Sequence, residues 1–168
     1  MEHPESGVPA VWDRLPDIPL YMDQVVDYLG RQLDGEGPTS SMVHNYVKSG
    51  LLPRPDGKRY SREHLARLSA ICLLKQVLPV SELGSLMPQG DTAAFYDGLV
   101  AMYEEELLKA AEMTPRPGEE SAIAALRLAV TACACRRLCL RLLEKGEGVP
   151  DGDKNSAHET RAKTKKPK

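Results

Sequence analysis

The 168-residue sequence has few aromatic residues, no excess of charge of one sign and no long apolar run. Aromatic residues make up 5% of it, with Trp12 and Phe95 the single examples of their kinds, so a core must be aliphatic, which favours helices. The formal net charge of −2 does not indicate a nucleic-acid binder, and such a role needs a local basic patch. No apolar run reaches the ~18 residues of a membrane span, so we expect no membrane segment.

Cysteine is also scarce, with four residues at positions 72, 133, 135 and 139. Segment 1–19 is polar and carries four prolines, unlike a signal peptide, so we expect a cytoplasmic protein with reduced thiols. Cys135 and Cys139 would share a helix face, whereas Cys133 would point elsewhere. Metal or redox sensing and plain packing both remain open for these three, and packing is the simpler interpretation. Nothing in the sequence suggests a catalytic triad, a phosphate loop or a cofactor, so we expect no enzyme.

Apolar residues recur at helical spacing in six segments, and capping residues or breakers mark their ends. The predicted helices are 22–33, 40–49, 62–78, 80–87, 92–113 and 119–145. The third is apolar all round at "AICLLKQVL", so we expect it to lie at the centre of the fold, and Pro79 should end it.

Proline, glycine and polar stretches divide the chain into four parts. The last ~20 residues are polar and end in "KTKKPK", which is typical of disordered basic tails. We therefore expect an all-α chain with one small β-wing. Its predicted parts are an extended arm at 1–19, a head at 20–88, a two-helix body at 91–145 and a disordered basic tail at 146–168.

The head contains an unusual concentration of basic residues between positions 48 and 67. On the predicted helix 40–49, one side carries Ser41, His44, Asn45 and Lys48, groups that can hydrogen-bond base edges and phosphates. The turn "RPDGKRY", at 54–60, follows this helix and carries three more cations. A polar helix followed by a basic β-turn is the layout of a winged helix-turn-helix, although a solvated helix face explains the helix alone.

The segment "YVKSGLLPRPDGKRYSREHLARL" resembles the head of MerR-type transcription regulators. Their pattern has a recognition helix, Gly-Leu-Leu/Ile-Pro, a wing with an Arg-Tyr pair and a following helix. The residues that match it are Tyr46, Gly50, Leu51, Leu52, Pro53, Arg59, Tyr60, Ser61, Leu65 and Leu68. The likeness covers about residues 20–87, and the whole chain is similar to an uncharacterised bacterial family with such a head.

The resemblance implies a sequence-specific transcriptional regulator that binds double-stranded DNA. It implies that Arg59 contacts phosphate from the wing and that Tyr60 packs at the wing base. The candidate DNA-binding residues are Ser41, His44, Asn45, Lys48, Arg54, Lys58, Arg59, Tyr60, Arg62 and His64. The alternative is a protein-interaction adaptor in which the same head binds protein and the basic patch is incidental.

The chain departs from the MerR pattern at several positions. MerR regulators usually carry Arg and Tyr where this chain has His44 and Asn45, and often Arg at Ser41. The loop 34–38 is longer than usual, and the body is not one long coiled-coil helix. The target sequence and the effector therefore do not carry over.

The predicted body carries more apolar surface than it can cover by itself. The sixth helix has one apolar face made of Ile123, Leu126, Val130, Ala134, Leu138 and Leu142. The fifth helix offers too few apolar residues to bury that face, and exposed patches of this size mark interfaces. We therefore expect a homodimer formed by the body.

Overall fold

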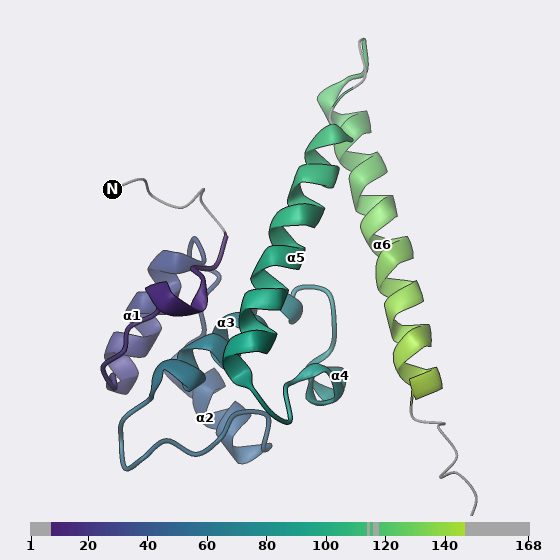
Figure 1. The fold of residues 1–168 in the computed structure, drawn as a ribbon. Helices are drawn as coiled ribbons and strands as arrows, with labels where there is room; N and C mark the ends of the chain where they lie inside the picture. Colours follow the sequence, from purple (N-terminus) through teal and green to yellow (C-terminus); the bar gives the residue numbers. More distant parts are fainter. Residues whose placement is uncertain (1–7, 114, 116–117, 147–168) are drawn as a thin grey trace, which may run out of the picture.

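The computed structural model describes residues 8–113, 115 and 118–146, and Figure 1 shows their arrangement. These residues form one short 3₁₀ helix and six α-helices. The elements are η1 (Trp12–Arg14), α1 (Met22–Gln32), α2 (Ser40–Lys48), α3 (Arg62–Leu74), α4 (Val80–Leu86), α5 (Thr92–Glu112) and α6 (Ser121–Gly146). The prediction of a mainly helical chain is confirmed. The predicted tail from residue 147 on, and the first seven residues of the predicted arm, lie outside the described residues.

Helix α3 forms the centre of the fold, as its all-round apolar sequence predicts. From Leu65 to Cys72 every side chain is buried except that of Arg67, which is half-buried. α1, α4 and α5 all contact α3, and each large aliphatic side chain buried between them contributes about 1.5–3 kcal/mol to folding. α3 ends at Leu74, earlier than predicted. The residue before Pro79 is disfavoured in helical geometry, and residues 75–77 form turns instead.

The segment before α1 packs against this core. The Leu15 side chain is 2% exposed, and the backbone N–H of Trp12 donates to the Asp97 carboxylate of α5 at 2.8 Å. The Arg62 guanidinium of α3 lies over the Trp12 ring, 5.6 Å from its centroid, and pairs with Asp17 at 3.2 Å. Residues 8–20 therefore fold together with the helices.

The expected β-wing does not form a sheet, and the described residues contain none. The basic turn, residues 53–60, has one isolated antiparallel bridge, in which the Arg59 N–H donates to the Asp56 carbonyl at 2.9 Å. A second bridge joins Tyr60 to Leu20, through N–H···O distances of 2.9 and 2.8 Å. Two of the eight residues of the turn are prolines, which have no N–H to donate to a strand ladder. The predicted small β-wing is therefore not formed as a pair of strands, although the turn itself is present.

Helices α5 and α6 form an antiparallel hairpin that projects from the core (Figure 1). On α5, the buried residues are Thr92, Tyr96 and Val100, which lie four residues apart on the face against the core. Arg127 of α6 stabilises the connection, since it donates to the Met113 carbonyl at 2.9 Å and pairs with Glu119 at 3.0 Å.

Candidate nucleic-acid interface

Helix α2 separates its apolar and polar residues in the way its sequence predicts. The Thr39 hydroxyl accepts a hydrogen bond from the Met42 N–H at 3.2 Å and caps the helix. Val43 and Tyr46 are 0% and 5% exposed and hold the helix on the core. The side chains on the opposite face are all exposed; they are Ser41, His44, Asn45 and Lys48.

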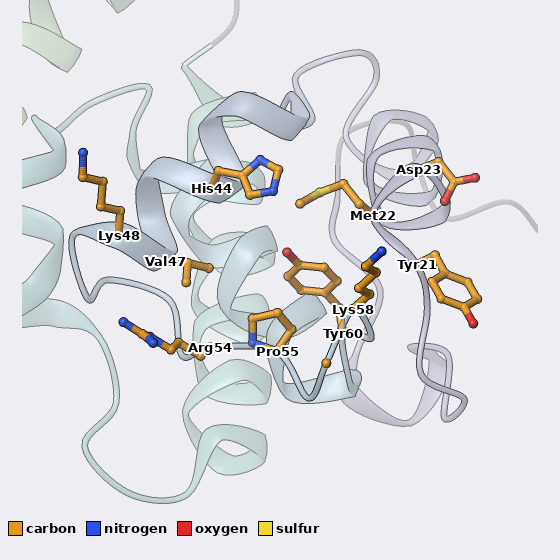
Figure 2. A pocket seen from close by; sticks show the side chains of 11 residues that line it. Tyr21, Met22, Asp23, His44, Val47, Lys48, Arg54, Pro55, Lys58 and Tyr60 are labelled. Atoms are coloured by element: carbon orange, nitrogen blue, oxygen red, sulfur yellow. The ribbon is translucent and has the colours of Figure 1, made fainter.

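An open groove of about 750 Å³ lies beside α2, between the start of α1 and the basic turn (Figure 2). Met22, Val47 and Tyr60 give it an apolar lining. Its charged and ionisable lining residues are Asp23, His44, Lys48, Arg54 and Lys58. Three cations and one carboxylate thus line the groove, so its charge favours an anionic ligand.

The cations that line the groove differ from the neighbouring arginines. None of the ion pairs among the described residues involves Lys48, Arg54 or Lys58. Arg59 instead donates to the Tyr21 hydroxyl at 3.3 Å, and its guanidinium lies 5.4 Å from the centroid of that ring. Binding an anion at the groove cations therefore breaks no existing ion pair.

Two predicted contact residues of α3 are engaged within the fold. The Arg62 guanidinium is held by Asp17 and the Trp12 ring. His64 is 9% exposed, and its Nδ1 accepts a hydrogen bond from the Ser61 N–H at 3.1 Å. Burial lowers the pKa of His64, which favours the neutral ring.

Tyr60 contacts both the groove and the buried His64 ring of α3. Its side chain is 4% exposed and packs edge-on against the His64 ring, with the centroids 5.5 Å apart. Figure 2 shows its hydroxyl among the groove side chains. Tyr60 therefore packs at the base of the turn and contributes to the groove lining.

The start of α1 completes the groove, and sequence reasoning assigned none of its residues to the interface. Tyr21, Met22 and Asp23 all line the groove. Tyr21 is exposed at 47% and meets Arg59 although 38 positions separate them. An exposed aromatic residue at the N-cap of a helix was the available signal, but only tertiary packing brings it to the turn.

Other kinds of site are not found in the part of the chain that the structure describes. It contains no group of three or more His, Cys, Asp or Glu side chains that could hold a metal ion. Its four cysteines are free thiols, with Cys72 buried, Cys139 half-buried and the other two exposed. No helix in this part is long and apolar enough to span a membrane.

Comparison with known proteins gives one match. The model of a protein family described as Domain of unknown function (DUF1836) matches residues 10–104, more than half of the chain. No curated protein matches the sequence. No solved structure matches it either.

Proposed function

The chain belongs to the DUF1836 family of unknown function, and for this member we propose a role as a sequence-specific, DNA-binding transcriptional regulator. The observation that carries the proposal is that Lys48, on the exposed polar face of α2, lines one groove with Arg54 and Lys58 of the basic turn, and that no ion pair among the described residues involves these three cations. DNA recognition needs both parts, because phosphate contacts position a protein and base contacts specify the sequence.

In this proposal α2 enters the major groove, which is wide enough for an α-helix. Asn45 is the best candidate reader, because a side-chain amide pairs with adenine through two hydrogen bonds. His44 and Ser41 flank it on the exposed face. Lys48 is the last residue of α2, and in this proposal it contacts a phosphate at the edge of the DNA major groove.

The basic turn grips the phosphates on one side of the helix. Arg59, which donates to the Tyr21 hydroxyl, is not among the residues that line the groove. The order of α2, basic turn and α3 supports a MerR-like winged helix-turn-helix in which the wing is a bridged turn. Arg62 and His64 are left out of the contact set.

We also propose that the protein acts as a homodimer. The apolar residues of α6 predicted to need a partner are exposed, with Leu126 and Val130 each at 60% and Leu142 at 70%. A dimer buries such a face, and its two-fold symmetry presents two α2 helices to a symmetric DNA site.

A protein-interaction adaptor is the second candidate, and the apolar lining of the groove favours it. The groove combines three cations with an apolar lining of Met22, Val47 and Tyr60. This combination also suits an acidic peptide with an apolar side chain. In that case the same surface would bind protein and would not discriminate between DNA sequences.

Selection of bound fragments from random DNA, followed by titrations of the selected and a scrambled site at two salt concentrations, tests the proposal. We expect Lys58→Ala to weaken binding to both DNAs and to lower the salt slope by ~1, because one phosphate contact is lost. Asn45→Ala should reduce discrimination between the two sites by about 1–3 kcal/mol.

Arg31→Ala is the matched control, because Arg31 is an exposed cation of α1 outside the groove, paired with Asp27 at 2.9 Å. It should leave the salt slope close to that of the wild type. If Lys58→Ala and Asn45→Ala both bind DNA as the wild type does, the adaptor is the better explanation. If Asn45→Ala weakens both DNAs equally, α2 is not the reader.

A further inference from the structure

A second, smaller cavity of about 250 Å³ shares no lining residue with the groove. Leu51 and Pro53 line it from the segment that follows α2, and Pro88 and Gln89 line it from the segment that joins α4 to α5. Arg67 of α3 is the only charged residue of the lining. The volume equals that of about eight water molecules at ~30 Å³ each, so the cavity suits a small ligand.

The Arg67 guanidinium is only partly satisfied by the protein. Its Nη2 donates to the Pro88 carbonyl at 3.1 Å and to the Thr92 hydroxyl at 3.3 Å, and both acceptors are neutral. Its Nε is buried and has no hydrogen-bond partner among the described residues. None of the ion pairs found among these residues involves Arg67. A buried charged donor without an acceptor is costly, and an oxyanion is the acceptor that matches a guanidinium best.

No acid of the lining neutralises Arg67, and backbone donors accompany it. Glu63, one helical turn before Arg67, is exposed and does not line the cavity. The Asp91 carboxylate also lies outside the lining and caps the start of α5. Among the described residues, no hydrogen bond uses the backbone N–H of Leu51 or of Gln89, and both residues line the cavity. The cavity thus combines one positive charge with N–H donors and lacks a negative charge.

We infer that this cavity binds a small oxyanion, a molecule with a carboxylate or phosphate group, through Arg67. The inference goes beyond the proposed function and does not depend on DNA binding. The oxyanion accepts hydrogen bonds from the guanidinium and from the N–H groups of Leu51 and Gln89, and it neutralises the charge of Arg67. Such a ligand contacts the segment that joins α2 to the basic turn, so its binding should stabilise that segment.

An NMR titration of the full-length protein tests the site. Inorganic phosphate and succinate are added in separate series at constant ionic strength, and the signals of the Arg67 Nε–H and of the Leu51 and Gln89 backbone N–H are followed. We expect the three signals to shift together and to saturate with one dissociation constant. That constant should be about 1 mM or lower for at least one of the two anions.

Three variants connect the binding to the cavity. Arg67→Gln should weaken it by at least about 10-fold, because charge-assisted hydrogen bonds are lost. Gly84→Glu leaves the guanidinium in place and adds a carboxylate to the lining, which should abolish the saturable shift. Gly84 is exposed, and a Cβ there would meet no atom within 4 Å, so this variant should keep the helical spectrum of the wild type. Arg31→Gln removes an exposed cation of α1 outside the cavity and should leave the dissociation constant unchanged.

Three results would overturn the inference. Signals that do not saturate with either anion up to about 20 mM would show that the cavity is no oxyanion site. Unchanged binding in Gly84→Glu would place the anion elsewhere, and this variant decides the question even if Arg67→Gln does not fold. A salt slope of DNA binding lowered by ~1 in Arg67→Gln would identify the oxyanion as a DNA phosphate and not a small ligand. The anion titrations contain no DNA, so failure of the proposed function leaves their outcome unaffected.

Discussion

The core region, residues 8–104, and the outer part of the α5–α6 hairpin, residues 105–146, draw on the same aliphatic residues but place them differently. In the core region, Leu29, Leu65 and Leu83 are each 0% exposed. Among the described side chains of residues 105–146, Ala124 alone is buried, and Leu108 and Leu142 are 71% and 70% exposed. Helical spacing of apolar residues therefore makes a core where five helices meet, and a surface where only two do.

The family match follows the same division. It covers residues 10–104, and the last buried residue of α5 is Val100. The matched part thus contains the buried core, α2 and the basic turn. The outer part of the hairpin lies beyond it and includes α6, where the proposed dimer contact is located.

Truncating one leucine in each region should give the largest contrast. Leu68→Ala in α3 should lower the free energy of unfolding by about 2–5 kcal/mol, since the residue is 0% exposed and leaves a cavity. Leu126→Ala in α6 should change it by less than about 0.5 kcal/mol in dilute protein. Urea unfolding followed by circular dichroism measures both. Similar losses for the two variants would contradict the contrast.

Thiol labelling should separate the two regions next. Burial raises the pKa of Cys72 from 9.0 to about 11, whereas Cys133 and Cys135 are exposed. The thiolate is the reactive form, so Cys72 should react at least about a hundredfold more slowly with a disulfide reagent. Peptide mass spectrometry assigns the modified residues, and all four should react at similar rates in denaturant. Fast labelling of Cys72 in the native protein would show that the core region opens.

Two glycine substitutions should show that packing also varies within the core region, between the loop beside α1 and the open side of α5. A Cβ at Gly37 would lie 2.6 Å from the Gly30 nitrogen in α1, so Gly37→Ala should destabilise the protein by about 1–3 kcal/mol. Gly98 lies inside α5 and would place its Cβ in open space, so Gly98→Ala should stabilise by about 0.5–1 kcal/mol. Thermal unfolding compares them. A stabilising Gly37→Ala would mean that α1 and the loop shift apart easily.

The smallest expected effect concerns the proton on His64. Burial lowers its pKa, and the charge of Arg67 acts in the same direction, while the Arg54 carbonyl and the Glu63 carboxylate oppose the change. The unfolded chain therefore binds more protons below about pH 6.5, so the free energy of unfolding falls as pH drops through the folded pKa.

His64→Gln is the matched test of that effect. Glutamine keeps a side-chain acceptor for the Ser61 N–H at the same helix position but does not titrate. Unfolding of this variant should be less sensitive to pH between 7 and 5 than unfolding of the wild type. Equal sensitivity in both would assign the pH effect to another group.

The elements of the fold were predictable because their signals are local. Apolar spacing and caps such as Asp91, which accepts from the Ala93 N–H at 2.9 Å, mark helix positions without reference to the rest of the chain. The polar face of α2 followed from the same periodicity. The predictions failed where a neighbouring proline mattered, at the end of α3 and in the basic turn, because proline restricts its neighbour and removes a donor.

The candidate site was predictable only in part. The exposed residues of α2 and the basic residues of the turn were visible as a sequence pattern. The engagement of Arg62 by Asp17, across 45 positions, and of Arg59 by Tyr21, across 38, was not. Such pairs depend on how the segment before α1 folds back over α3, and no local propensity records that path.

The sequence by itself determined the helices, the apolar centre at α3 and the apolar face of α6, because each depends on residues within a few turns of one another. Tertiary structure alone decided which cations remain free, which side of α6 stays uncovered and where the groove lies. Those properties depend on burial and on distances between segments far apart in the chain, and both arise only when the helices pack.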